Sequence, residues 1–182
     1  MANGGNGETR KTVAQVAKEV IQHKTELELL ITDPVSDIAI LKSQESSKNY
    51  LSFSKEKVKK GGEIYVIGFP FGKILSSESK TTKGIVSSLQ GLANNYSNFQ
   101  IDSAIQPGNS GGPIINPEGF LVGITVATAD YKVIFKTFDV LPQNINFGIK
   151  ASVLRNILES NEVEFFTETE ESFFNFFNEK IS

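Results

Sequence analysis

Hydrophobic and polar residues alternate in short runs along most of the chain, and Gly, Pro and Asn separate the runs. Alternation with a period of two is typical of strands that bury one face. Eight runs are expected to be strands: ELELLITD (26–33), DIAILKS (37–43), EIYVIGF (63–69), TTKGIVSSL (81–89), NFQIDSA (98–104), GPIIN (112–116), FLVGITVAT (120–128) and INFGI (145–149). Short strands at this spacing predict an all-β chain with an antiparallel barrel or sandwich.

Helical spacing is clear in one place only, the run SVLRNILES at residues 152–160. Its apolar residues form one stripe, and Ser152 is expected to cap its N-terminus. Residues 13–21 fit a helix or a short strand equally well, so that assignment stays open. Asn116 to Gly119 has the composition of a turn, which predicts a hairpin over residues 112–127.

Changes in composition predict three parts along the chain. Residues 1–60 begin with a mobile Gly/Asn-rich stretch and end in a Ser/Lys-rich connector, residues 61–150 hold most of the expected strands, and residues 151–182 hold the helix and a tail. From 161 onward the tail contains six Glu against one Lys, with six Phe among them. The last four Phe, at 173, 174, 176 and 177, share one face of a helix, and such a face must dock against an apolar surface.

Charge and composition exclude several classes of function. The net charge of −3 offers no basic surface for nucleic acid. The absence of Cys rules out disulfides and thiolate chemistry, and a single His leaves few ligands for zinc, so no metal or cofactor is expected. No run approaches the roughly 20 apolar residues of a membrane span, and the first ten residues lack the apolar core of a signal peptide, so the chain reads as soluble.

The segment GNSGG, residues 108–112, surrounds Ser110 with glycines that cost backbone entropy. A serine nucleophile in acyl transfer needs an exposed hydroxyl and two backbone N–H groups that point the same way, and a tight irregular turn brings such groups together. Gly108 and Ser110 would supply that pair. A glycine-rich hairpin turn that happens to contain a serine explains these five residues alone equally well.

Further segments resemble the HtrA/Deg group of trypsin-like serine proteases over about residues 25–164. GNSGGPIINPEGFLVGI resembles the nucleophile segment of that family, and DPVSDIAILK, GEIYVIGFPFG with TTKGIVSSL, and LPQNINFGIKASVLRNILESNEV resemble three others in the right order. The resemblance implies a chymotrypsin-like double β-barrel, here with an incomplete N-terminal barrel and followed by the helix and the acidic, Phe-rich tail. No segment of these 182 residues is expected to form the PDZ domain that usually accompanies this family.

Carried onto this sequence, the resemblance makes Ser110 the nucleophile, Asp37 the residue that orients a histidine, and Gly108 and Ser110 the oxyanion-hole donors. Ala104 stands where trypsin has its basic-specific acid and Ile105 adds an apolar wall, so the specificity pocket should suit small aliphatic side chains. Asn109 replaces the acid that digestive relatives pair with a new N-terminus. Activation by N-terminal cleavage is therefore not expected. Activation by the ordering of loops is expected instead.

The resemblance fails at the histidine that would act as the general base, because the Thr-Asn-x-His-Val motif that carries it in the family is missing. The only imidazole is His23, fourteen residues before Asp37, and an exposed polar role is the simpler interpretation of it. Two interpretations follow: a truncated serine endopeptidase that is nearly inactive alone, or a catalytically dead pseudo-protease that binds peptides or assembles with other chains.

The resemblance also implies partners and a location. A polypeptide substrate or peptide ligand is expected, with no nucleic acid and no membrane span. Family analogy favours a homotrimer, while unpaired strand edges in a missing half-barrel would invite a second chain to complete it. The sequence itself does not fix the compartment, and the same analogy points to a periplasmic or otherwise exported protein.

Overall fold

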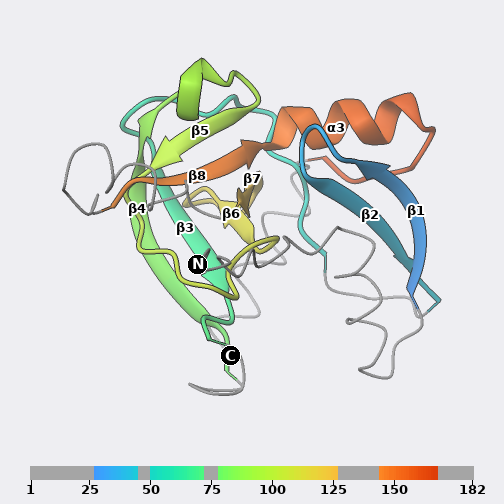
Figure 1. Ribbon diagram of the computed structural model, residues 1–182, viewed down its shortest axis with the longest axis horizontal. Coiled ribbons are helices and arrows are strands. Elements are labelled where there is room, and N and C mark those ends of the chain that lie inside the picture. The colour runs from blue at the N-terminus through green and yellow to red at the C-terminus, as the bar shows by residue number, and fades with distance from the viewer. Residues whose placement is uncertain (1–26, 45–49, 72–77, 127–143, 168–182) are drawn as a thin grey trace, which may run out of the picture. The chain divides into compact units, whose positions relative to one another are not determined.

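The computed structural model describes residues 27–44, 50–71, 78–126 and 144–167, and these divide into two compact units, residues 1–50 and residues 51–182 (Figure 1). Each unit is described by itself. The predicted segment at 13–21, His23 and the four Phe of 173–177 lie outside the described residues.

The first unit contains a two-stranded antiparallel sheet. Strand β1 (Leu27–Asp33) pairs with β2 (Ile38–Ser43), and a bulge interrupts the register between Leu29 and Ile31. Ile38 is buried, whereas Leu29 is 42% exposed. Both strands fall where the alternation of apolar and polar residues predicted them.

The second unit is a closed barrel with the strand order β3-β4-β5-β8-β7-β6. The strands are β3 (Glu63–Gly68), β4 (Lys80–Ser88), β5 (Asn98–Ile101), β6 (Pro113–Ile115), β7 (Leu121–Val126) and β8 (Asn146–Lys150), and a short 3-10 turn, η3 (Leu92–Asn94), precedes β5. Every neighbouring pair is antiparallel. The all-β prediction is confirmed, and closure leaves this sheet without an open edge.

The barrel interior is filled by residues from alternating strand positions. Phe99 is at the centre and is fully buried, and the core cluster around it is Ile64, Val66, Val86, Ile101, Ile105, Ile114 and Val122. Gly123 and Gly148 make room for the Phe99 ring, since a Cβ atom on either would lie within 3 Å of it. The two glycines thus allow one large ring to fill this level of the barrel.

The hairpin predicted over residues 112–127 is confirmed by β6, β7 and their turn. Gly119 has a φ of +86° and its N–H bonds the Asn116 carbonyl at 3.0 Å, while the Asn116 side-chain oxygen accepts from the Phe120 N–H at 2.8 Å. Glycine is the residue that adopts such a backbone conformation without a steric penalty.

Helix α3 (Ala151–Ser160) follows β8 directly and packs against β7 and β8. The prediction that Ser152 caps this helix is wrong: the capping position is Lys150, whose side chain makes no capping hydrogen bond. Because β8 runs straight into the helix, its last residue, still extended at φ −63° and ψ 139°, takes the capping position, and Ser152 falls in the first turn.

Candidate active site

The nucleophile turn, which we define as residues 106–112, connects β5 to β6. Its N–H groups at Asn109 and Gly112 bond the carbonyls of Gln106 at 3.0 Å and Asn109 at 2.9 Å, respectively. Gly108 and Gly111 have φ values of +103° and +83°. These two left-handed glycines flank Asn109 and Ser110, and Ser110 is exposed to solvent.

The N–H groups of Gly108 and Ser110 differ from those of Asn109, Gly111 and Gly112. Gly111 N–H bonds the Thr125 carbonyl at 2.8 Å, and Thr125 N–H bonds the Gly112 carbonyl at 2.8 Å, so β7 holds the far side of the turn. Among the residues that the structure describes, no acceptor bonds the N–H groups of Gly108 and Ser110. These are the two donors that the sequence assigned to an oxyanion hole, and both remain available to a ligand.

The segment after β3 fixes the conformation at Gly108. The Phe71 N–H bonds the Pro107 carbonyl at 2.7 Å, and a Cβ atom on Gly108 would collide with the Phe69 carbonyl oxygen. Glycine is therefore required at 108 twice, by its φ and by this close approach. The sequence alone suggested the first reason; the second depends on a contact with a segment about 40 residues away.

The side chain of Asn109 is buried in the protein, whereas its neighbour Ser110 is exposed to solvent. Only 4% of Asn109 is exposed, and its Oδ1 atom has no hydrogen-bond partner in the described part of the chain. A Cβ atom added to Gly68, the last residue of β3, would come within 2.6 Å of that oxygen. Gly68 thus leaves room for the amide, and the buried amide anchors the turn on β3.

The two residues predicted for the specificity pocket lie side by side after β5 but differ in environment. Ala104 is exposed, and its carbonyl accepts a hydrogen bond from Thr82 Oγ1 at 3.0 Å. Ile105 is 9% exposed and belongs to the barrel core. Ala104 is therefore the one with a side chain open to a ligand.

Asn146, at the start of β8, holds the chain just before Ala104. Its Nδ2 atom donates to the Ser103 carbonyl at 2.7 Å, and Asn146 itself is 3% exposed. No motif pointed to Asn146 or to Thr82, because each bonds residues 103–104 only once the barrel strands have paired. A buried Asn within the apolar run INFGI was the one signal available.

Asp37 belongs to the other unit, at the end of the β1–β2 turn. It is exposed and has a φ of +57°, a backbone conformation that Asp adopts more readily than most residues. The turn is held by Asp33, whose Oδ1 atom accepts from the N–H groups of Val35 at 3.0 Å and Ser36 at 3.3 Å. Hydrogen bonding to Ser36, first through its side chain and then through its backbone, holds the pKa of Asp33 below its ordinary value of 3.8.

The described segments contain no group of three or more His, Cys, Asp or Glu residues arranged to hold a metal ion. No helix within them is long and apolar enough to cross a membrane.

Comparison with known proteins places the chain in a family. The model of the trypsin-like peptidase domain matches residues 2–124. An uncharacterized protein of Sinorhizobium fredii, y4bJ, is 33% identical over 72% of this chain, and a probable periplasmic DegP-like serine endoprotease of Pseudomonas putida is 40% identical over 64% of it. The chain spans 21% and 25% of those two proteins' lengths.

A solved structure agrees with these sequences. The serine endoprotease from Yersinia pestis superposes with a TM-score of 0.58 at 27% identity, over 75% of this chain and 44% of that one. The resemblance that rested on four sequence segments is thereby confirmed. The chain belongs to the trypsin-like peptidase family and, within it, to the HtrA/DegP type.

Proposed function

We propose that this chain carries the nucleophile and oxyanion hole of a serine endopeptidase. The observation that supports this most directly is the pair of N–H groups at Gly108 and Ser110, which have no acceptor among the described residues and lie beside an exposed hydroxyl, in a turn where the N–H groups of Asn109, Gly111 and Gly112 are bonded. Preorganised donors aimed at developing negative charge are the largest single contribution to acyl-transfer catalysis in many enzymes.

In this proposal Ser110 Oγ attacks the carbonyl carbon of a peptide bond, and the two N–H groups stabilise the oxyanion. The leaving amine departs with a proton, and water then hydrolyses the acyl-enzyme. Asp37 would orient an imidazole and stabilise its cationic form. Ala104 would admit a small aliphatic side chain of the substrate, because neither charge nor bulk stands at that position.

The proposed site lacks an identified general base for Ser110. The single imidazole of the sequence, His23, is outside the motif that carries the histidine in the family, and a serine hydroxyl without a positioned base is a poor nucleophile. Removal of the histidine from such triads lowers kcat by about 10⁶. We therefore expect the 182-residue chain to turn over peptides very slowly by itself.

A second candidate function follows from the same missing motif. A pseudo-protease would keep the turn and the barrel and bind a peptide without cutting it. The Pseudomonas relative is described as periplasmic. A periplasmic location and, by family analogy, a homotrimeric assembly fit both candidates equally.

A fluorophosphonate probe tests the proposal on the purified chain. Intact mass should show one adduct, and Ser110→Ala should abolish it, whereas Ser87→Ala, a serine of β4, should label like the parent. Loss of the adduct in a further variant, His23→Ala, would identify the base. A folded parent chain that forms no Ser110-dependent adduct even on prolonged incubation would contradict the peptidase proposal and favour the pseudo-protease.

A further inference from the structure

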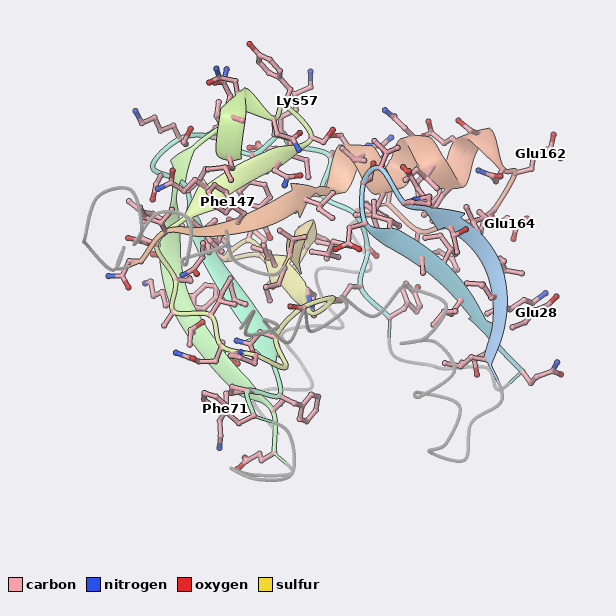
Figure 2. The ribbon with its side chains drawn as sticks, in the orientation of Figure 1. Glu28, Lys57, Phe71, Phe147, Glu162 and Glu164 are labelled. Atoms are coloured by element: carbon pink, nitrogen blue, oxygen red, sulfur yellow. The ribbon has the colours of Figure 1, made fainter. Side chains whose placement is uncertain are left out.

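A cavity of about 150 Å³ lies at the end of the barrel away from the nucleophile turn. It is formed by the segment before β3, the start of β3 and the β6–β7 turn. Strand β3 begins at this cavity and ends at Gly68, against Asn109, so the two sites are separated by the length of β3, about 20 Å. Figure 2 shows Lys57, which lines the cavity, and Phe71, beside the nucleophile turn, at opposite ends of the barrel.

The cavity has an apolar interior and a charged rim. Ile64, Val86 and Val122 of the barrel core line it, together with the partly buried Val58. Its exposed lining residues include Glu56, Lys57, Lys59 and Glu118. Cavities of roughly 150 Å³ with aliphatic walls hold a benzene ring, so the volume and the lining suit one aromatic side chain.

At Thr167, the last residue that the structure describes, the chain runs toward this cavity. Thr167 lies beside Phe53 in a parallel bridge, and the Phe53 N–H bonds the Phe166 carbonyl at 2.9 Å. The next residue after Phe53 is Ser54, which lines the cavity. Because the pairing is parallel, the backbone at Thr167 points the same way as the backbone that leads from Phe53 to Ser54.

Aromatic contacts already anchor the residues that lead to this point. The rings of Phe53 and Phe165 meet edge to face with their centroids 5.2 Å apart, and the Arg155 guanidinium lies 5.8 Å from the centroid of the Phe165 ring. This arrangement fixes where the chain leaves α3 and where Thr167 lies on the barrel.

The sequence after Thr167 has the chemistry that the cavity suits. It reads ETEESFFNFFNEKIS, with three Glu in its first four residues and four Phe at 173–177. The segment Lys55 to Lys60 at the rim contains four Lys and one Glu, and Lys57 has no ion-pair partner among the described residues. Phe173 is six positions after Thr167 in the sequence, a reach of up to about 20 Å.

We propose that residues 168–182 dock in cis on this end of the barrel, with one Phe ring of the 173–177 cluster in the cavity and the Glu residues of 168–171 beside the Lys residues of 55–60. The apolar ring supplies the attraction, and the exposed charges orient the segment more than they hold it. The docking site is separate from Ser110 and does not depend on the proposed peptidase activity.

Disulfide cross-linking in the full chain tests this proposal, because the natural sequence contains no cysteine. The pair Lys57→Cys with Ser172→Cys should close an intramolecular disulfide under mild oxidation. The matched control is Thr81→Cys with Ser172→Cys, since Thr81 is exposed on β4 at the other end of the barrel. We expect the first pair to close at least tenfold faster, read by intact mass and non-reducing electrophoresis.

Replacement of the four Phe residues by Ser in the Lys57→Cys, Ser172→Cys variant should slow closure to the rate of the control pair. Methyl resonances of Val58 and Val122 should shift on the same replacement, because an aromatic ring leaves their surroundings. Equal rates for the two cysteine pairs, or unchanged closure without the four Phe, would overturn the proposal. A covalent dimer in place of the intramolecular disulfide would overturn docking in cis and identify a second copy as the occupant.

Discussion

The barrel and the β1–β2 hairpin carry the two ends of the same proposed triad, yet they are built differently. The barrel closes on itself around Phe99, and the turn with Ser110 is bonded to β7 and packed against β3. The hairpin has two strands, and Leu29 in it is 42% exposed. Two-stranded hairpins are marginal in water by themselves. The nucleophile turn is therefore preorganised by its own unit, whereas the geometry at Asp37 rests on a single turn.

The largest expected difference between the two units is in their tolerance of a lost side chain. Phe99→Ala should lower the free energy of unfolding by about 3–5 kcal/mol, because it empties the centre of a close-packed barrel. Leu29→Ala should lower it by less than about 1 kcal/mol, because much of that side chain already contacts water. Urea unfolding of the two variants measures this, and similar midpoints would contradict the distinction between the units.

Substitution at Gly108 should separate activation of the turn from stability of the barrel. In Gly108→Ala the new Cβ meets the Phe69 carbonyl and φ is unfavourable, so the N–H donors should move and fluorophosphonate labelling should fall at least tenfold. The matched control is Gly111→Ala, where φ is also positive but a Cβ would have no neighbour within 4 Å. Labelling rates are the readout, and equal losses would show that backbone strain alone, not the contact with Phe69, controls the turn.

Loss of the Asn146 side chain should lower the stability of the barrel more than its position at a strand end suggests. Asn146→Ala leaves the buried Ser103 carbonyl without the donor at 2.7 Å, which should lower the free energy of unfolding by about 1–3 kcal/mol and loosen the chain at Ala104. Thr82→Val removes the exposed bond to the Ala104 carbonyl and should have a smaller effect. Calorimetric melting of both variants tests the order, and a larger effect at Thr82 would reverse it.

The strands and the glycine turn were predictable from the sequence because their signals are local. Short β-type runs separated by Gly, Pro and Asn mark β1 to β8, and GNSGG marks a turn whatever surrounds it. The capping of α3 was not predictable: Ser152 is a good capping residue, but β8 runs into the helix and leaves the position to Lys150. Likewise, the roles of Asn146 and of Phe69 arise from strand register and from a contact distant in sequence, which a local pattern does not contain.

The smallest expected effect is a pH dependence confined to the hairpin. Bonds from Ser36 hold the pKa of Asp33 below 3.8, so the stabilisation of the turn is present above that pH and is lost as pH falls through the lowered pKa. Backbone resonances of residues 34–37 should therefore shift on acidification below pH 3.8, while those of the nucleophile turn stay in place. Asp33→Asn keeps a capping oxygen without a titrating group and should abolish the shift. If both turns responded together and alike, the hairpin and the barrel would not be independent, and acid would act on the protein as a whole rather than on the turn that carries Asp37.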